Sequence, residues 1–186
     1  MARKPATYED LVQVPETKVA EVLGGELVVC PRPAFRHALA SSELGAEIIG
    51  RFGMGHRGLG GWWFLDEPEL HFGHDVVVPD LAGWCKERMP KVPDVNFHTL
   101  APDWLCEVIS PSTETIDRAR KLPIYAVAGV KHAWLLNPTT RTLEVLRLEQ
   151  GKWLLLGAFA GDALARAEPF EAAEIDLLPL WGETRG

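Results

Sequence analysis

The chain carries two carboxylates at points where buried strands are expected to end. Glu107 stands inside the apolar segment 104–109, and Asp80 follows a second apolar run at residues 76–78. A lone ionised carboxylate in a buried strand destabilises the fold unless a charged partner meets it. Two such acids at adjacent strand ends can instead hold one divalent ion, because Mg²⁺ takes one or two carboxylates together with waters and substrate phosphate.

Each of these residues also has an ordinary structural explanation. Asp80 could cap a strand, and Glu107 could pair with a buried arginine. Lys121 follows Asp117 by four residues, so the two share one face of a helix. Most pairs with this spacing are solvated surface pairs. Next to Glu107, the same lysine could offset the charge that develops on a phosphate during its hydrolysis.

These residues also stand in a pattern that resembles a known family. The pattern consists of Pro79-Asp80, then Glu107-Val108-Ile109-Ser110-Pro111-Ser112-Thr113, then Asp117, Lys121, Tyr125 and Gly129-Val130. It resembles the Uma-type restriction endonuclease family of the PD-(D/E)XK nuclease superfamily. The resemblance extends from about Glu21 to the region of Trp134, and more weakly to Leu180-Trp181.

The resemblance implies a metal-dependent endonuclease that hydrolyses DNA phosphodiester bonds. It implies that Asp80 and Glu107 are catalytic and bind Mg²⁺ or Mn²⁺, with the carbonyl of Val108 as a further ligand. Ile109 stands where the superfamily has its lysine, two residues after Glu107 on the same strand face. The resemblance implies that Lys121, on the following helix, substitutes for that lysine.

Three further residues are candidates for the site. Glu21 matches the family's N-terminal glutamate and could be a third catalytic acid, although a carboxylate that faces water from an edge strand is an equal alternative. His37 matches the family's N-terminal histidine and could contact a substrate phosphate, or it could lie on a helix surface. Asp117 is expected to assist substrate binding by positioning Lys121 rather than to bind the metal.

Other motifs do not support a different chemistry. His71, His74 and Asp75 lack a third strong ligand pattern for zinc. No G-x-S-x-G surrounds Ser110 or Ser112, so neither is expected to be a nucleophile. The glycine-rich stretch 53–61 lacks the lysine of a phosphate-binding loop and predicts a loop or hairpin tip.

The composition is that of an ordinary globular protein. The chain has 186 residues, of which 47% are hydrophobic and 24% charged, which suits one domain over residues 1–186. The net charge of −7 counts against a protein that coats nucleic acid, because such binding depends on lysine and arginine. Local basic groups are Arg32 with Arg36, and Arg118, Arg120 and Lys121, the second group beside the proposed site.

No apolar run is long enough to span a bilayer, and no signal-peptide core follows the start of the chain. Cys30, Cys85 and Cys106 lack paired or metal-site spacing and are expected to be buried free thiols. We therefore expect a cytoplasmic protein with no membrane partner and DNA as a transient substrate. Cleavage of a duplex would favour a homodimer.

The order of elements predicts a mixed α/β fold, which the resemblance specifies as restriction-endonuclease-like: a central mixed sheet flanked by helices, with an N-terminal hairpin and helix. Helices are expected after Thr7, from Phe35 to about Arg51, and from Ser112 or Thr113 to Ala128, with Pro123 kinking or restarting the last one. Strands are expected over residues 19–23, 26–30, 62–65, 69–72, 76–78, 81–84, 104–109, 132–136, 142–148 and 153–158.

Two other functions remain open from the sequence. One is an interaction or nucleic-acid-binding protein that has kept the nuclease fold without catalysis. The complete set of two acids and a lysine argues against it, since a decayed enzyme need not retain all three. The other is a phosphodiesterase that acts on small nucleotides, which the acidic balance of the chain favours.

Overall fold

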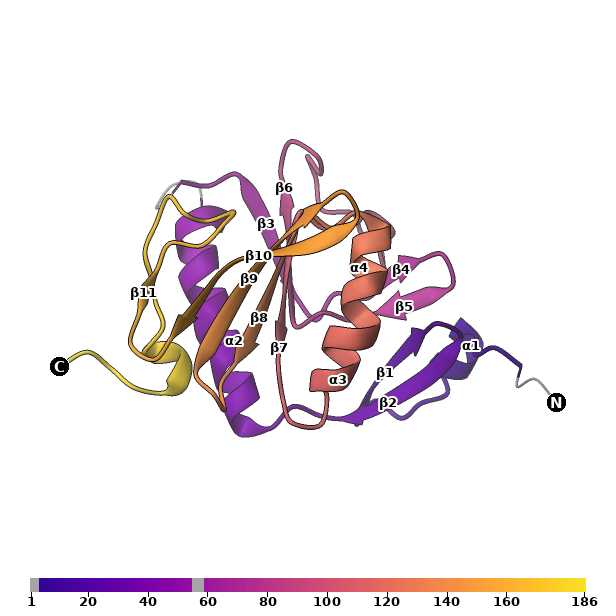
Figure 1. Ribbon diagram of the computed structural model, residues 1–186. Coiled ribbons are helices and arrows are strands. Elements are labelled where there is room, and N and C mark those ends of the chain that lie inside the picture. The colour runs from indigo at the N-terminus through magenta and orange to yellow at the C-terminus, as the bar shows by residue number, and fades with distance from the viewer. Residues whose placement is uncertain (1–3, 55–58) are drawn as a thin grey trace.

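The computed structural model describes residues 4–54 and 59–186 (Figure 1). It begins with helix α1 (Tyr8–Leu11) and the hairpin of strands β1 (Lys18–Leu23) and β2 (Glu26–Pro31). The backbone N–H of Thr7 donates to Asp10 over 2.8 Å, which caps α1 as the sequence predicts. Gly24 and Gly25 have φ angles of 57° and 78°, which the tight hairpin turn requires.

This hairpin belongs to a small antiparallel sheet that the sequence does not reveal as a separate unit. Strands β4 (Leu70–Phe72) and β5 (Asp75–Val77) complete it in the order β2-β1-β5-β4. The carboxylate of Asp75 accepts a hydrogen bond of 2.6 Å from the backbone N–H of Gly24. Asp75 therefore secures the hairpin turn, rather than taking part in a zinc site with the neighbouring histidines.

A second, larger sheet forms the centre of the molecule, with six strands among the described residues in the order β10-β9-β8-β7-β6-β3. Its strands are β3 (Trp62–Asp66), β6 (Leu81–Cys85), β7 (Trp104–Val108), β8 (His132–Asn137), β9 (Thr142–Glu149) and β10 (Lys152–Ala160). Neighbours run antiparallel except β7 and β8, which are parallel. The sheet is thus mixed, as expected.

The parallel pair requires a long crossover, which the helical segment between β7 and β8 supplies. The segment consists of α3 (Glu114–Ile116), a π-helical turn (Asp117–Lys121) and α4 (Leu122–Ala128). The restart expected at Pro123 occurs, because this proline lies in the first turn of α4, directly after the π turn. Gly129, with a φ angle of 82°, ends the helix.

The two faces of the central sheet bury separate hydrophobic cores. Helix α2 (Phe35–Ile48), the π turn Ile49–Gly53 and the C-terminal segment cover one face (Figure 1). That segment contains β11 (Leu164–Ala165), β12 (Ile175–Asp176) and a 3₁₀ turn (Pro179–Trp181). Helix α4 and the small sheet cover the other face.

Side-chain alternation along β7 decides where Glu107 points. Cys106 and Val108 pack with the α2 core, whereas Leu105 and Ile109 pack with the α4 core. Glu107 therefore faces α4, on the same side as Ile109, as the sequence predicts. Ile109 is 1% exposed within that core.

Most predicted elements are present within a residue or two of their expected limits. The helix expected from residue 112 or 113 to 128 is interrupted by its π turn, since a proline near the middle cannot continue a regular helix. Of the glycine-rich stretch 53–61, residues 55–58 lie outside the described part. Of the three cysteines, Cys106 is buried as expected, but Cys30 and Cys85 are only half-buried. None of the described helices is long and apolar enough to cross a bilayer.

Close packing around Gly83 gives a testable prediction for the sheet that carries the site. A Cβ at Gly83 would lie 2.9 Å from the ring of Phe64 and 3.3 Å from that of Trp104. We expect Gly83→Ala to lower the free energy of unfolding by about 1–3 kcal/mol, because the core must shift to admit it. Urea unfolding measures this change. Gly157→Ala is the control, because its Cβ would meet Phe159 at an ordinary 3.6 Å; equal effects of the two changes would contradict the prediction.

Candidate active site

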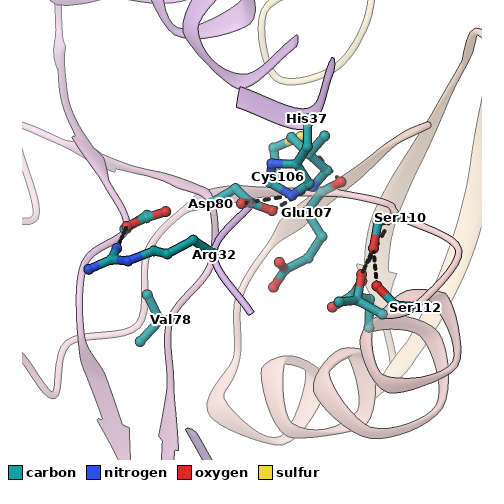
Figure 2. Close-up of polar contacts among 12 residues, drawn as sticks. Arg32, His37, Val78, Asp80, Cys106, Glu107, Ser110 and Ser112 are labelled. Atoms are coloured by element: carbon teal, nitrogen blue, oxygen red, sulfur yellow. Dashed lines mark hydrogen bonds and ion pairs between the residues drawn. The ribbon is translucent and has the colours of Figure 1, made fainter. Parts of the chain in front are cut away.

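A cavity of about 310 Å³ opens at the end of β7 where the small sheet, the central sheet and the π turn meet. Its lining includes four carboxylates and one lysine that the sequence singles out: Glu21, Asp80, Glu107, Asp117 and Lys121. Figure 2 shows Asp80 and Glu107 close together beneath His37, with Arg32 on one side and Ser110 and Ser112 on the other. Segments about 100 residues apart thus supply one site.

Strand register places Asp80 opposite Glu107. The antiparallel partners Leu81 and Cys106 end the ladder between β6 and β7, so the residue before Leu81 faces the residue after Cys106. Directly opposite residues lie on the same face of a sheet. Asp80 accepts a hydrogen bond of 2.7 Å from the backbone N–H of Val108, which fixes its carboxylate beside β7.

Lys121 occupies the centre of the cluster. Its ammonium nitrogen lies 2.9 Å from Glu107, 3.0 Å from Glu21 and 3.9 Å from Asp117. It also donates to the carbonyl of Val78 over 3.1 Å. The lysine side chain is only 4% exposed. The surface-pair explanation of Lys121 and Asp117 is therefore wrong: both side chains are buried.

Helical spacing explains how one segment delivers several of these groups. Asp117, Lys121 and Tyr125 recur every four residues and so share one face. The hydroxyl of Tyr125 donates to Glu107 over 2.5 Å, to the same carboxylate oxygen that Lys121 contacts. Tyr125 belongs to the family pattern, but the sequence gives it no role; its spacing from Lys121 is the signal that could have found it.

Burial and crowding shape the protonation of the cluster. Burial raises the pKa of Glu107 well above its usual range, and Lys121 offsets only part of this while three neighbouring carboxylates add to it. Burial alone would lower the pKa of Lys121, but Glu107 and the other acids hold it well above its usual value. The lysine therefore stays charged.

Asp117 also has a raised pKa. Burial raises its pKa to about 6, against the opposing effects of Lys121 and of a hydrogen bond with Thr113. The folded protein thus binds a proton at Asp117 at pH values where the unfolded chain has already released it.

Glu21 points into the site rather than into water, so the edge-strand alternative is wrong. Its carboxylate is 8% exposed and accepts a hydrogen bond of 2.7 Å from the backbone N–H of Val78. Val78 also accepts from Lys121 through its carbonyl. The hairpin and the segment before Asp80 are in this way held together by one acid and one lysine.

His37 lies in the site and not on the helix surface. Its Nε2 is 3.2 Å from the carboxylate of Asp80, and its side chain is 12% exposed. Burial lowers the pKa of the imidazole, but the contact with Asp80 reverses this and leaves the pKa raised. Because α2 carries His37 and β7 carries Glu107, the two faces of the central sheet both contribute to the site.

The cavity also has a polar rim. The hydroxyl of Ser110 lies 3.0 Å from those of Ser112 and Thr113, and all three residues line the cavity. Arg32 lines it as well; it donates to the carbonyl of Glu16 over 2.7 Å and lies 3.7 Å from Glu67.

Two of the three basic residues that were expected beside the site do not line the cavity. Arg118 pairs with Glu144 on β9 at 2.5 Å, and Arg120 donates to the carbonyl of Leu23 at 2.6 Å. Both arginines therefore fasten the crossover helix to the sheets. Only Lys121 of this basic group lines the site.

The donor set fits a divalent ion of the magnesium type, although no three His, Cys, Asp or Glu side chains in residues 4–54 and 59–186 converge as a ready-made metal cage. Mg²⁺ needs no such cage, because water and substrate oxygens complete its shell. Asp80 and Glu107 face each other across the strand register beside Val108. The acids of the site also outnumber its buried cation, Lys121.

Comparison with known proteins identifies a family and a similar fold. The profile of a family described as "Uma2: Putative restriction endonuclease" matches residues 5–178. The fold is similar to the crystal structure of "a putative nuclease belonging to DUF820" from Anabaena variabilis ATCC 29413. The TM-score is 0.76 and the identity 23%, over 96% of this chain and 98% of that one. The restriction-endonuclease-like fold predicted from the sequence is confirmed. A search of curated proteins gave no match.

The raised pKa of Asp117 predicts how stability depends on pH. A raised pKa contributes stability that is present below about pH 4 and is lost as the pH rises through about 6. We therefore expect Asp117→Asn to gain stability over the parent at pH 7, on the order of 2 kcal/mol, and to gain little at pH 4. Urea unfolding at several pH values measures the difference.

Glu114→Gln is the matched control for this change. It also converts an acid to an amide on the same helical segment, but its carboxylate is 45% exposed in a pair with Arg118. The prediction is wrong if the free energies of unfolding of Asp117→Asn and the parent differ by the same amount at every pH. The Asp117 carboxylate would then titrate as it does in the unfolded chain.

Proposed function

Because the chain belongs to the Uma2 family of putative restriction endonucleases, we propose that it is a divalent-metal-dependent nuclease that hydrolyses DNA phosphodiester bonds. The observation that carries the proposal is the contact of Lys121 with Glu107 at 2.9 Å, in a cavity that Asp80 also lines. Two acids and one ammonium group are the parts that a metal-assisted phosphodiester hydrolysis requires.

Asp80, Glu107 and the carbonyl of Val108 are the proposed metal ligands. A bound Mg²⁺ or Mn²⁺ supplies positive charge at the phosphoryl oxygen and acidifies water near it. The hydrogen bond from the backbone of Val108 aims the Asp80 carboxylate, and Tyr125 fixes that of Glu107. Both acids are thus oriented before a substrate arrives, which reduces the reorganisation that the reaction needs.

Lys121 is the proposed stabiliser of charge on the phosphate. Its raised pKa keeps it protonated at neutral pH, and the carbonyl of Val78 fixes its position. Glu21 and Asp117 contact the lysine directly, so we assign them to positioning it. His37, within 3.2 Å of Asp80, is placed to contact a substrate phosphate.

One observation favours a second candidate, a phosphodiesterase of small nucleotides. The cavity of about 310 Å³ is of the size of a small-ligand pocket, and most of its charged lining is acidic. A non-catalytic protein is less well supported, because Asp80, Glu107 and Lys121 all line one cavity. We further propose that residues 1–186 act as one domain in the cytoplasm; the homodimer stays a prediction for duplex cleavage.

Metal binding should stabilise the folded protein. Clustered carboxylates repel one another, and a divalent ion that binds only the folded state raises its stability by mass action, by about 2.7 kcal/mol at one hundred times the dissociation constant. We expect the melting temperature to rise in millimolar MnCl₂ and not in NaCl of equal ionic strength. Asp80→Asn should abolish most of the rise. An equal response to both salts would count against the metal site.

Cleavage itself tests the function. We expect Mn²⁺-dependent hydrolysis of DNA by the parent protein and a loss of at least 100-fold in single-turnover rate for Asp80→Asn. Asp80 is the preferred site for substitution because removing Lys121 would strand three buried carboxylates and unfold the chain for structural reasons. A variant that folds, binds no metal and still cleaves DNA would refute the assignment.

A further inference from the structure

The cavity at the active site does not end at Asp80. A second hollow of about 380 Å³ adjoins it along helix α2, lined by Ala38, Ser42 and Asp66 among others. The two hollows share four residues: Pro33, His37, Glu67 and Asp80. Asp80 therefore lies where two hollows join, and open space extends from it in two directions.

A ligand that fills both hollows is longer than a single nucleotide. The first hollow offers the hydroxyls of Ser110 and Ser112, together with Arg32, whose side chain is 57% exposed although it contacts Glu16 and Glu67. These groups are suitable partners for phosphate oxygens. The second offers the hydroxyls of Ser41 and Ser42 beside small side chains of α2, and Asp66 and Glu67 also line it. A chain of phosphodiesters can thus extend in both directions from the bond that lies at Asp80 and Glu107.

The depth and charge of the site select against an intact duplex. The side chain of Glu107 is 2% exposed and that of Lys121 is 4% exposed. A phosphate group must therefore move out of the regular backbone of a duplex and into the cavity to reach them. A protein that engages the two backbones of a duplex needs lysines and arginines along its surface. Here the net charge is −7, and Arg118 and Arg120 are bound to the protein's own sheets. One flexible strand meets these conditions better than two paired ones.

An exposed aromatic residue at the start of α2 is next in sequence to residues that line the hollows. Phe35 is the first residue of α2, between Ala34 and His37, which both line the first hollow. It is 90% exposed and enters no ring-to-ring contact among the residues that the structure describes. Unpaired bases stack on such rings, whereas the bases of a duplex are already stacked on one another.

We propose that the natural substrate of this site is single-stranded DNA, which lies along both hollows with a base on Phe35 and a phosphate at Arg32. This inference rests on the proposed nuclease function and names its substrate. It distinguishes the protein from an enzyme of small nucleotides, which would fill the first hollow alone, and from an enzyme that grips a duplex.

Binding provides a test that does not depend on cleavage. Fluorescence anisotropy with a labelled oligothymidine of about twelve nucleotides, in CaCl₂, should give tighter binding than a hairpin duplex of the same length. Phe35→Ala should weaken binding of the single strand about tenfold or more, because a stacking platform is lost. Val127→Ala is the matched control: Val127 is 91% exposed on α4, away from both hollows, so neither change removes buried packing.

Cleavage assays then test the role of the second hollow separately from that of the first. Ser42→Trp fills the second hollow from an exposed position on α2. In MnCl₂ it should slow hydrolysis of the oligonucleotide at least tenfold more than that of thymidine 5′-(p-nitrophenyl phosphate). Circular dichroism checks its folding. Parent rates on thymidine oligonucleotides of increasing length provide a measure that needs no variant: they should rise until both hollows are spanned and then level off.

The outcomes distinguish the inference from the function on which it rests. If the protein binds the single strand in a way that depends on Phe35 but cleaves no substrate, the binding path along the two hollows is supported and the nuclease proposal is overturned. If it cleaves duplex in preference, and neither Phe35→Ala nor Ser42→Trp has an effect, the binding path is overturned and the nuclease proposal stands. Rates that do not depend on length would assign the site to small nucleotides. If the protein neither binds nor cleaves any of these substrates, the single-strand inference and the nuclease proposal are both overturned.

Discussion

A buried ammonium group among carboxylates is the constraint on which the rest of this structure depends. Lys121 contacts Glu21 of the small sheet, Glu107 of the central sheet and Asp117 of its own helix. Each acid would destabilise the fold if it were buried alone, and so would the lysine. The cluster therefore fixes how the two sheets and the crossover helix meet, since any arrangement that separates them leaves buried charge uncompensated.

The same constraint accounts for local features that look irregular. The π turn spans Asp117 to Lys121, the two residues of the segment that must both reach the cluster. Such turns are frequent at functional sites, and here the following Pro123 prevents a regular helix from continuing through this point. Tyr125, one turn further along the segment, also reaches the cluster and donates to Glu107.

Much of this arrangement could be predicted from the sequence, and the limits have physical causes. Glu107 in an apolar strand demanded a charged partner, for which the sequence offered a metal ion or a buried arginine; the partner in the structure is Lys121, at 2.9 Å. The side to which Glu21 points could not be decided, because strand alternation defines two faces but not which of them is buried. Arg118 and Arg120 looked equivalent to Lys121 by composition; only the helical rotation in three dimensions turns them towards Glu144 and Leu23. The second hollow has no signal in the sequence, because it arises from small side chains on α2 facing a loop distant in the chain.

The separation of these partners along the chain has a consequence for how the protein is made. Arg120 reaches the carbonyl of Leu23 across 97 positions, and Lys121 meets Glu21 beside it. Contacts of such high sequence separation form late, because closing a long loop loses much chain entropy before any contact repays it. During synthesis, the hairpin emerges from the ribosome well before the helix that completes the charge cluster. The nascent chain thus carries Glu21 without the lysine, and the charge cluster assembles only once the crossover helix has docked.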